Sequence, residues 1–189
     1  MKRTLKPARE IGGTIQVPGD KSIAHRAALF SILSKGPIRI KNFPSSADCL
    51  VSLEAAKRFG VKVAEDEGVL LLTPPDTISI EPDEIIDCGN SGTTARLLSG
   101  IIAGSNVEVT LTGDESLKAR PMKRIIEPLS AMGAEFFAQD GYLPMRIRGG
   151  QLRSFEYRLP VASAQVKSAL LLAGLASSCA VAVREDIIT

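Results

Sequence analysis

Apolar and polar positions along this chain follow one plan that occurs three times. In each copy a strand-like stretch leads to a short polar turn that ends in serine, and an apolar helix follows the turn. The three serines are Ser22, Ser91 and Ser163. The helices that follow them are predicted over residues 23–35, 93–103 and 165–177. Similar segments at a near-constant spacing indicate duplicated supersecondary units, each too small to bury its own apolar face.

The first two copies each carry a second predicted helix. These helices cover residues 46–59 and 116–132. Gly60 and Gly133 follow them directly, as is typical of a helix C-terminus. Pro121 suits the first turn of the later helix, where its missing N–H costs nothing. Pro128 lies within the apolar pattern, and we expect it to kink or interrupt that helix.

Two predicted strand pairs follow the second helices and complete the repeating unit. Their strands cover residues 61–64, 69–73, 134–138 and 143–148. The unit is therefore β-α-β-α-β-β, found twice in full, whereas the third copy reaches Thr189 before its second helix. The first helix of each unit is apolar nearly all round, which predicts burial on all sides. We expect an α/β fold whose central helices are enclosed by small sheets and other helices, with the third unit incomplete.

Composition narrows the classes of function. The chain of 189 residues has 23 Lys and Arg against 21 Asp and Glu, with 4% aromatic residues. This near balance lacks the basic footprint of a nucleic-acid binder, and few rings are present to stack on bases. No apolar run reaches the roughly 18 residues of a membrane span, and the polar, basic start has no secretory signal. One His and three Cys show no metal-ligand spacing, so we expect a cytoplasmic protein without a metal or cofactor.

Basic side chains gather at the predicted helix starts, where the positive end of the helix dipole disfavours them. They include Lys21, Arg26, Arg96, Arg120 and Lys167. A bound anion would make this unfavourable placement favourable. The alternative is that nearby carboxylates neutralise the cations and that the three turn serines merely cap their helices. The carboxylates concerned are Asp20, Asp114 and Glu115.

Four segments of the chain resemble the signatures of the 5-enolpyruvylshikimate-3-phosphate (EPSP) synthase family. They lie, in the family's order, at residues 18–27, 89–97, 111–122 and 163–168. The resemblance implies two similar domains, each of three β-α-β-α-β-β units around buried parallel helices. It also implies transfer of the enolpyruvyl group of phosphoenolpyruvate to the 5-hydroxyl of shikimate 3-phosphate, with release of phosphate. Both substrates are polyanions, in agreement with the cations at the helix starts.

The resemblance also implies which residues bind the substrates. The expected shikimate 3-phosphate ligands are Lys21, Ser22, Arg26, Ser163 and Gln165. The expected phosphoenolpyruvate ligands are Lys21, Gly92, Arg120 and Gln165, with Lys21 as the catalytic residue. Gly92 implies sensitivity to glyphosate, which mimics phosphoenolpyruvate, because tolerant enzymes carry a bulkier residue there. Ala164 stands where many relatives have a second serine, so one phosphate contact comes from backbone or is lost.

The resemblance extends to domain organisation and partners. It implies that residues 1–12 form a crossover strand toward a second domain, and that residues 13–189 are an N-terminal domain truncated in its third repeat. Acid and base carboxylates would come from that C-terminal domain, so we expect no turnover from this chain alone. The expected partners are the two small-molecule substrates and the second domain, without nucleic acid or membrane.

Two other functions of the same fold remain as alternatives. One is UDP-N-acetylglucosamine enolpyruvyl transferase, whose loop carries a reactive Cys before an Ala-Arg-Pro stretch and an Asn after its Lys. Here residues 114–117 contain no Cys, and Ser22 follows Lys21. The other is a non-catalytic module that binds phosphate or RNA, against which the low aromatic content and balanced charge argue.

Overall fold

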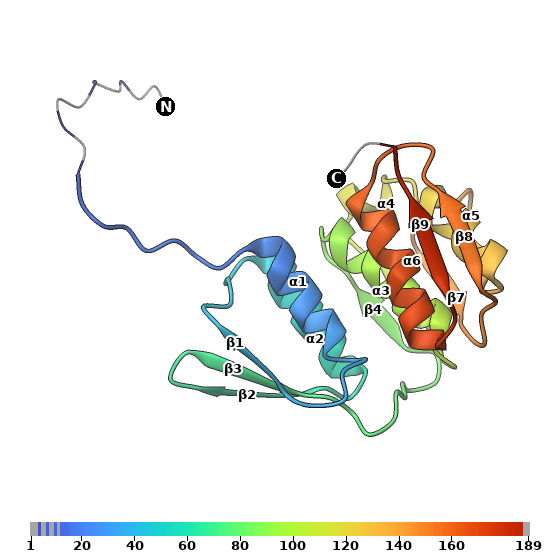
Figure 1. Cartoon of the computed structure of the whole chain (residues 1–189), viewed down its shortest axis with the longest axis horizontal. Helices are drawn as coiled ribbons and strands as arrows, with labels where there is room; N and C mark the ends of the chain where they lie inside the picture. The colour runs from blue at the N-terminus through green and yellow to red at the C-terminus, as the bar shows by residue number, and fades with distance from the viewer. Residues whose placement is uncertain (1–3, 5–6, 8–9, 11, 187–189) are drawn as a thin grey trace.

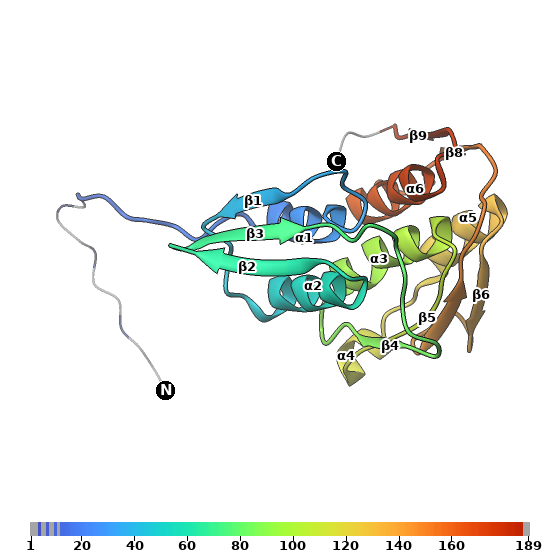
Figure 2. The ribbon, with the colours of Figure 1, turned by 90° about the horizontal axis from the view of Figure 1, so that it is seen from below.

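The first unit combines two helices with one small sheet. The structure, a computed structural model, describes residues 4, 7, 10 and 12–186. Its first elements are α1 (Lys21–Phe30), β1 (Ile38–Lys41), α2 (Ala47–Arg58), β2 (Lys62–Asp66) and β3 (Val69–Thr73). The sheet has the order β1-β3-β2 with antiparallel pairing throughout, and α1 and α2 cover one of its faces (Figure 2). The predicted hairpin around residues 65–68 is confirmed.

The second unit repeats this plan with one more strand and a divided second helix. It contains β4 (Ile85–Asp87), α3 (Gly92–Gly104), β5 (Glu108–Thr112), α4 (Glu115–Lys118), α5 (Lys123–Met132), β6 (Glu135–Ala138) and β7 (Met145–Arg148). Its sheet has the order β4-β5-β7-β6, in which β4 and β5 are parallel and the other pairs antiparallel.

The third unit is shorter in the part of the chain that the structure describes. It consists of β8 (Phe155–Arg158), α6 (Ala164–Ser177) and β9 (Val181–Arg184), with β8 and β9 paired in parallel. This pairing matches that of β4 and β5 around α3. Figure 1 shows the three units in chain order, with α3 and α6 side by side. The repeat deduced from the sequence is therefore present in three dimensions.

Two local expectations are wrong. The strand-like stretch before α1 forms no strand, since residues 12–20 have no regular structure. The predicted helix over 116–132 is two helices, α4 and α5, separated at residues 119–122. Pro121 accounts for this break, because a proline disfavours helical backbone at the residue before it. Pro128 lies inside α5 without ending it.

Most of the crossover strand expected over residues 1–12 lies outside the described residues.

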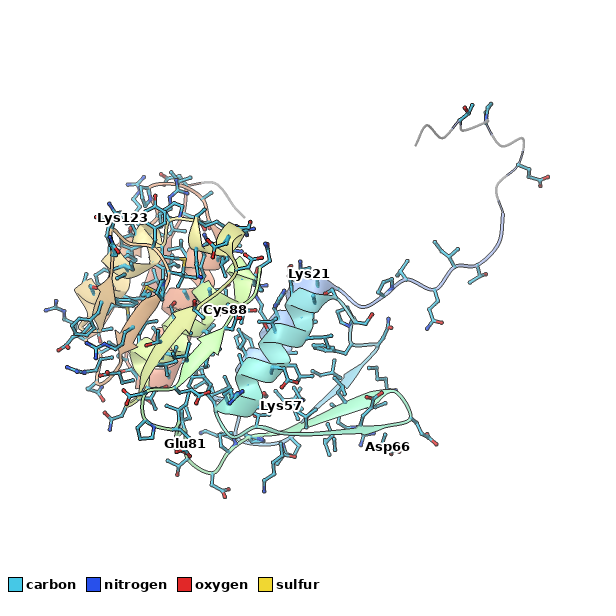
Figure 3. The ribbon with its side chains drawn as sticks, turned by 180° about the vertical axis from the view of Figure 1, so that it is seen from behind. Lys21, Lys57, Asp66, Glu81, Cys88 and Lys123 are labelled. Atoms are coloured by element: carbon cyan, nitrogen blue, oxygen red, sulfur yellow. The ribbon has the colours of Figure 1, made fainter. Side chains whose placement is uncertain are left out.

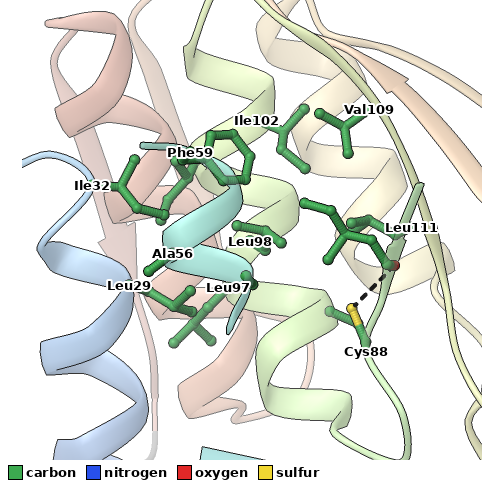
Figure 4. Close-up of a cluster of buried hydrophobic side chains, with 14 of the residues drawn as sticks. Leu29, Ile32, Ala56, Phe59, Cys88, Leu97, Leu98, Ile102, Val109 and Leu111 are labelled. Atoms are coloured by element: carbon green, nitrogen blue, oxygen red, sulfur yellow. Dashed lines mark hydrogen bonds between the residues drawn. The ribbon is translucent and has the colours of Figure 1, made fainter. Parts of the chain in front are cut away.

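Within the described part, one hydrophobic cluster joins the first two units. Figure 4 shows it: α1, α2 and the turns after them contribute Leu29, Ile32, Ala56 and Phe59, and the second unit contributes Leu97, Leu98, Ile102, Val109 and Leu111. The first two units therefore share one core.

Helices α3 and α6 lie in close contact and run in the same direction. A Cβ atom on Gly100 would come within 2.1 Å of the carbonyl oxygen of Ala169. One turn later, a Cβ on Gly104 would come within 2.3 Å of the carbonyl oxygen of Ala173. Because a step of four residues on one helix matches a step of four on the other, the helices are parallel and their N-termini share one end.

Helices α1 and α2 are parallel as well, and the starts of all four helices meet at one end. Lys21 contacts Asp48, and one turn later His25 contacts Ser52. The buried parallel helices that the family resemblance implies are thus present.

The expectation of burial on all sides holds for α3 alone among the three first helices. Every residue of α3 is at least partly buried, and most are fully so. In α1 and α6, four large apolar side chains are exposed by 42–68%. They are Ile23, Phe30, Leu171 and Leu175. The physical reason is that no described element packs over these faces, whereas α3 has neighbours on every side.

Candidate anion-binding site at the helix N-termini

The start of α1 places a lysine and a serine in its first turn. The side chain of Asp20 caps this helix by accepting a hydrogen bond from the Ile23 amide at 2.7 Å. The prediction that Ser22 caps α1 is therefore wrong, because Ser22 lies inside the helix and Asp20 fills that role. Both Lys21 and Ser22 are exposed, and the Lys21 ammonium group pairs with the Asp48 carboxylate of α2.

The start of α3 combines a capping serine with a glycine. Ser91 Oγ accepts from the Thr94 amide at 3.2 Å, as predicted for this serine. A Cβ on Gly92 would lie 2.6 Å from Arg96 Nη1 and 3.3 Å from Arg120 Nη1. The bare backbone at Gly92 therefore leaves room for two guanidinium groups to come together.

Arg120 reaches this place from the loop between α4 and α5. Its Nη2 donates to Asn90 Oδ1 at 2.7 Å, and Asn90 Nδ2 in turn donates to Asp114 Oδ2 at 2.8 Å. The hydrogen bonds from Asn90 and from the Leu117 amide lower the pKa of Asp114. Asp114 is thus an N-cap of α4 and orients Asn90, which holds Arg120.

The start of α6 connects to both other helices. Ser163 caps α6, its Oγ accepting from the Val166 amide at 3.4 Å. Gln165 accepts from Arg96 Nη1 at 3.1 Å and donates to Thr93 Oγ1 at 3.0 Å. Farther along α6, Ser168 Oγ accepts from Arg26 Nη2 at 3.0 Å. These bonds hold the starts of α1, α3 and α6 together at one end of the molecule.

The electrostatics of this end favour an anion. The first turns of α1, α3 and α6 contain no acidic residue. The pKa of Arg96 is lowered by burial, and then by the neighbouring positive charges of Arg120 and Arg124. Like charges held together beside helix N-termini repel each other unless a negative group lies between them. Asp114 interacts with Arg120, and Glu115 pairs with Lys118, so the neutralising alternative is correct in part. Asp20 caps α1 instead, and Asp48, which was not among the expected carboxylates, pairs with Lys21.

The structure places all seven predicted ligands at or beside these helix starts. They are Lys21, Ser22, Arg26, Gly92, Arg120, Ser163 and Gln165. Arg26 and Gln165 make direct bonds between helices, whereas Arg120 is joined to the start of α3 through Asn90.

Sequence reasoning did not single out Asp48. It contacts Lys21 from another helix, 27 residues away, and no local pattern marks such a pair. The apolar faces of α1 and α2 predict that the two helices of this unit pack together. They do not predict which residues of α1 face which residues of α2.

Among the described residues, no group of three or more His, Cys, Asp or Glu side chains is placed to hold a metal ion. No helix in the same part of the chain is both long and apolar enough to cross a membrane.

Repeated α/β units around parallel helices, whose starts gather at one end, define the enolpyruvyl transferase fold. The cationic side chains at that end make it a candidate anion-binding site. The family model for EPSP synthase (3-phosphoshikimate 1-carboxyvinyltransferase) matches residues 5–188. The chain therefore belongs to the EPSP synthase family.

Named relatives agree with this assignment. The 3-phosphoshikimate 1-carboxyvinyltransferase of Thermodesulfovibrio yellowstonii is 51% identical over 179 residues, which are 93% of this chain and 42% of that protein. That of Salinibacter ruber is 50% identical over 183 residues, covering 94% and 43%. The solved EPSP synthase of Acinetobacter baumannii superposes with a TM-score of 0.83 at 38% identity, covering 94% of this chain and 41% of that one.

The chain thus spans about two fifths of the length of these relatives. The names found do not favour either alternative, the UDP-N-acetylglucosamine enolpyruvyl transferase or the module that binds phosphate or RNA.

Proposed function

We propose that this chain carries part of the substrate site of an enzyme that transfers the enolpyruvyl group of phosphoenolpyruvate to the 5-hydroxyl of shikimate 3-phosphate. The observation that carries the proposal is the convergence of three helix N-termini with Arg26, Arg96 and Arg120. Such an end suits two phosphorylated carboxylic acids, since backbone N–H groups and guanidinium groups both donate to phosphate and carboxylate oxygens. Family membership supports the same substrates.

The proposed shikimate 3-phosphate site lies between α1 and α6. Lys21, Ser22 and Arg26 line it from α1, and Ser163 and Gln165 line it from α6. Arg26 and Ser163 suit the phosphate group, because both lie where helix starts add positive potential. Arg26 already donates to Ser168, so the ligand meets a guanidinium group whose direction is set before binding.

The proposed phosphoenolpyruvate site lies at the start of α3. Gly92 leaves space beside the Arg96 and Arg120 guanidinium groups, and Gln165 reaches the same place from α6. A bulkier residue at position 92 would displace the Arg96 guanidinium group, which is a proposed anion donor of this site. Because Gly92 leaves that group in place, we propose that glyphosate, as an analogue of phosphoenolpyruvate, binds here too. No metal or cofactor is part of the proposed reaction.

Lys21 is the proposed catalytic residue of this chain. Attack of the 5-hydroxyl oxygen on C2 of phosphoenolpyruvate, with loss of the hydroxyl proton and addition of a proton to C3, forms a tetrahedral intermediate. Loss of phosphate from C2 together with a proton from C3 then regenerates the double bond. An ammonium group near both substrates stabilises the negative charge that moves between oxygens during these steps. Lys21 is paired with Asp48, so a bound substrate would either replace Asp48 as the partner of Lys21 or contact Lys21 beside it.

We further propose that the acid and base groups belong to a second domain, with residues 13–189 as the first, and that the protein is cytoplasmic. The support for the second domain is that the chain spans about two fifths of its relatives' length. The support for the location is membership of a family of biosynthetic enzymes. On this proposal the chain binds shikimate 3-phosphate weakly and has no turnover by itself.

The function is tested by the change in melting temperature that shikimate 3-phosphate causes. We expect a rise for the wild-type chain and none for Lys21→Ala, because the ligand loses a charged partner. Lys57→Ala is the matched control, since Lys57 is an exposed, ion-paired lysine at the far end of the same helix pair (Figure 3). It should keep the full rise.

Other ligands separate the alternatives in the same assay. A rise with UDP-N-acetylglucosamine in place of shikimate 3-phosphate, or a salt-dependent response to RNA, would contradict the proposal. An unchanged rise in Lys21→Ala would remove Lys21 from the ligand contacts.

A further inference from the structure

A continuous chain of polar side chains crosses the core between α1, α2 and α3. His25 Nδ1 lies 2.7 Å from Ser52 Oγ, and Ser52 Oγ lies 2.7 Å from Thr94 Oγ1. Thr94 Oγ1 lies 2.7 Å from Ser91 Oγ, the cap of α3. All four residues are buried, with exposed fractions of 0–1%. Burying a polar group costs free energy because its hydrogen bonds to water are lost, and the bonds along this chain of side chains offset that cost.

The two ends of this chain lie at the two halves of the candidate site. His25 precedes Arg26 in the sequence and lies one helical turn after Lys21. At the other end, Ser91 and Thr94 flank Gly92. The middle residue, Ser52, is one turn after Asp48, the partner of Lys21. None of the bonds that tie α6 to the other helices performs this task, because they do not join α1 to α3 directly.

We propose that His25, Ser52, Thr94 and Ser91 form a hydrogen-bonded relay that fixes the starts of α1 and α3 relative to each other, and that His25 is thereby a positioning residue of the anion site. The ligand assigned to that site rests on the proposed function, whereas the relay does not. The relay connects the first and second repeat units. It therefore sets the distance between Lys21 at the start of α1 and Gly92 at the start of α3.

The direction of the relay follows from the other nitrogen of the ring. His25 Nε2 is buried without a hydrogen-bond partner among the described residues. A buried N–H without an acceptor is rarer in proteins than a buried acceptor without a donor. We place the proton on Nδ1, from which it is donated to Ser52, because a ring N–H at Nε2 has a fixed direction whereas a hydroxyl proton can rotate. Ser52 then donates to Thr94 and Thr94 to Ser91, and the Ser91 hydroxyl keeps the one proton of the relay without an acceptor among the described residues.

The surroundings of the ring agree with a neutral imidazole. Burial lowers the pKa of His25, and the positive charges of Lys21 and Arg26 lower it further, while Asp48 acts in the opposite direction.

Nitrogen-15 NMR of the imidazole tests the direction of the relay in the unliganded chain. His25 is the one histidine of the sequence, so its ring signals need no assignment. We expect a single neutral tautomer with the proton on Nδ1, kept at pH values below 6.5. A proton on Nε2, or an average of two tautomers, would overturn the relay as described.

Paired substitutions at Thr94 test the positioning role. Thr94→Val keeps the shape and removes the hydroxyl, whereas Thr94→Ser keeps the hydroxyl and removes a methyl. Thr94→Val removes two bonds of the relay, those to Ser52 and Ser91. We expect it to raise the Kd for shikimate 3-phosphate about fivefold to tenfold, an effect of the size of one net hydrogen bond. It should also move the backbone amide resonances of Lys21 and Arg26. Thr94→Ser should remain close to wild type in both.

Ser99→Ala is the control for a buried hydroxyl on the same helix. Ser99 Oγ donates to the Ala95 carbonyl at 2.7 Å and takes no part in the relay. If Ser99→Ala has the same effects as Thr94→Val, or if Thr94→Val lowers stability without moving the Lys21 and Arg26 resonances, the positioning role is wrong. If Thr94→Val does not fold, Ser52→Ala removes the same link and takes its place.

The outcomes separate the relay from the proposed function. Absence of shikimate 3-phosphate binding by the wild-type chain would contradict the proposed function alone. The tautomer of His25 and the amide resonances would still decide whether the relay positions the two helix starts.

Discussion

Individual residues at the helix starts serve either the helix or the site. Asp20, Ser91 and Ser163 satisfy free amide groups of α1, α3 and α6, the usual role of a capping side chain. Lys21 and Arg26 do the opposite, because a cation near a helix N-terminus raises the free energy of its own helix. Their partners lie on other helices, Asp48 for Lys21 and Ser168 for Arg26, and the proposed anion would favour the same placement.

At this scale we expect the stability of the protein to depend on the charge of His25. Because its pKa is lowered in the folded state, the unfolded chain binds more protons as the pH falls below the ordinary value of 6.5. Stability is thus fully present above pH 6.5 and is lost below it, by at most about 1.4 kcal/mol per pH unit for one proton.

The measurement is urea unfolding between pH 7.5 and 5.5, with His25→Asn as the comparison. Carboxylates titrate in both proteins, so the difference between the two curves isolates the histidine. Parallel curves would show that burial does not hold His25 neutral.

Among the elements, α3 and α6 have the closest contact. Glycines at 100 and 104 let the two backbones approach, and Gln165 joins their starts to Arg96. This contact holds the third unit against the second and keeps both N-termini at one end. Gly100 and Gly104 therefore allow α3 and α6 to lie close enough for their N-termini to reach the same candidate site.

Gly100→Ala is expected to lower the free energy of unfolding by about 1–3 kcal/mol, the usual cost of adding a methyl group to a packed contact. The new Cβ would meet the Ala169 carbonyl oxygen at 2.1 Å, and backbone cannot move aside as a flexible side chain does. Gly36→Ala is the control, since nothing lies within 4 Å of its Cβ. Equal urea midpoints for both variants would argue against the contact.

In the whole molecule, the first and second units share one core. Phe59 is fully buried at the end of α2 and belongs to the same cluster as Leu98 and Ile102 of α3. Because apolar surface from both units is buried together, the loss of one unit exposes the other. The candidate site depends on this arrangement, since its ligands come from all three units.

We expect Phe59→Ala to destabilise both units together, by about 3–5 kcal/mol. Phe59→Leu should act in the same direction with a smaller effect, which keeps the test usable if the alanine variant does not fold. Hydrogen exchange read by NMR at α1 and at α3 should change in parallel. Leu50→Ala, on the exposed side of α2, should change little. Separate melting of the first unit would contradict a shared core.

Much of this architecture was predictable from local patterns. The repeat, the two hairpins, the helices other than the divided one, and the caps Ser91 and Ser163 all depend on residues close together in the sequence. Periodicity and turn chemistry act over a few residues, so they can be deduced without knowing the fold. The four resembling segments led to the proposed site residues, and the structure places these residues at or beside the helix starts.

Three features depended on contacts between distant residues. The ion pair of Lys21 with Asp48, the relay from His25 to Ser91, and the exposed faces of α1 and α6 follow from how helices are aligned and covered. A local pattern states which residues share a helix face, but not which face of another helix it meets. Only the packed structure decides that register, because it depends on the volumes of side chains from all units at once.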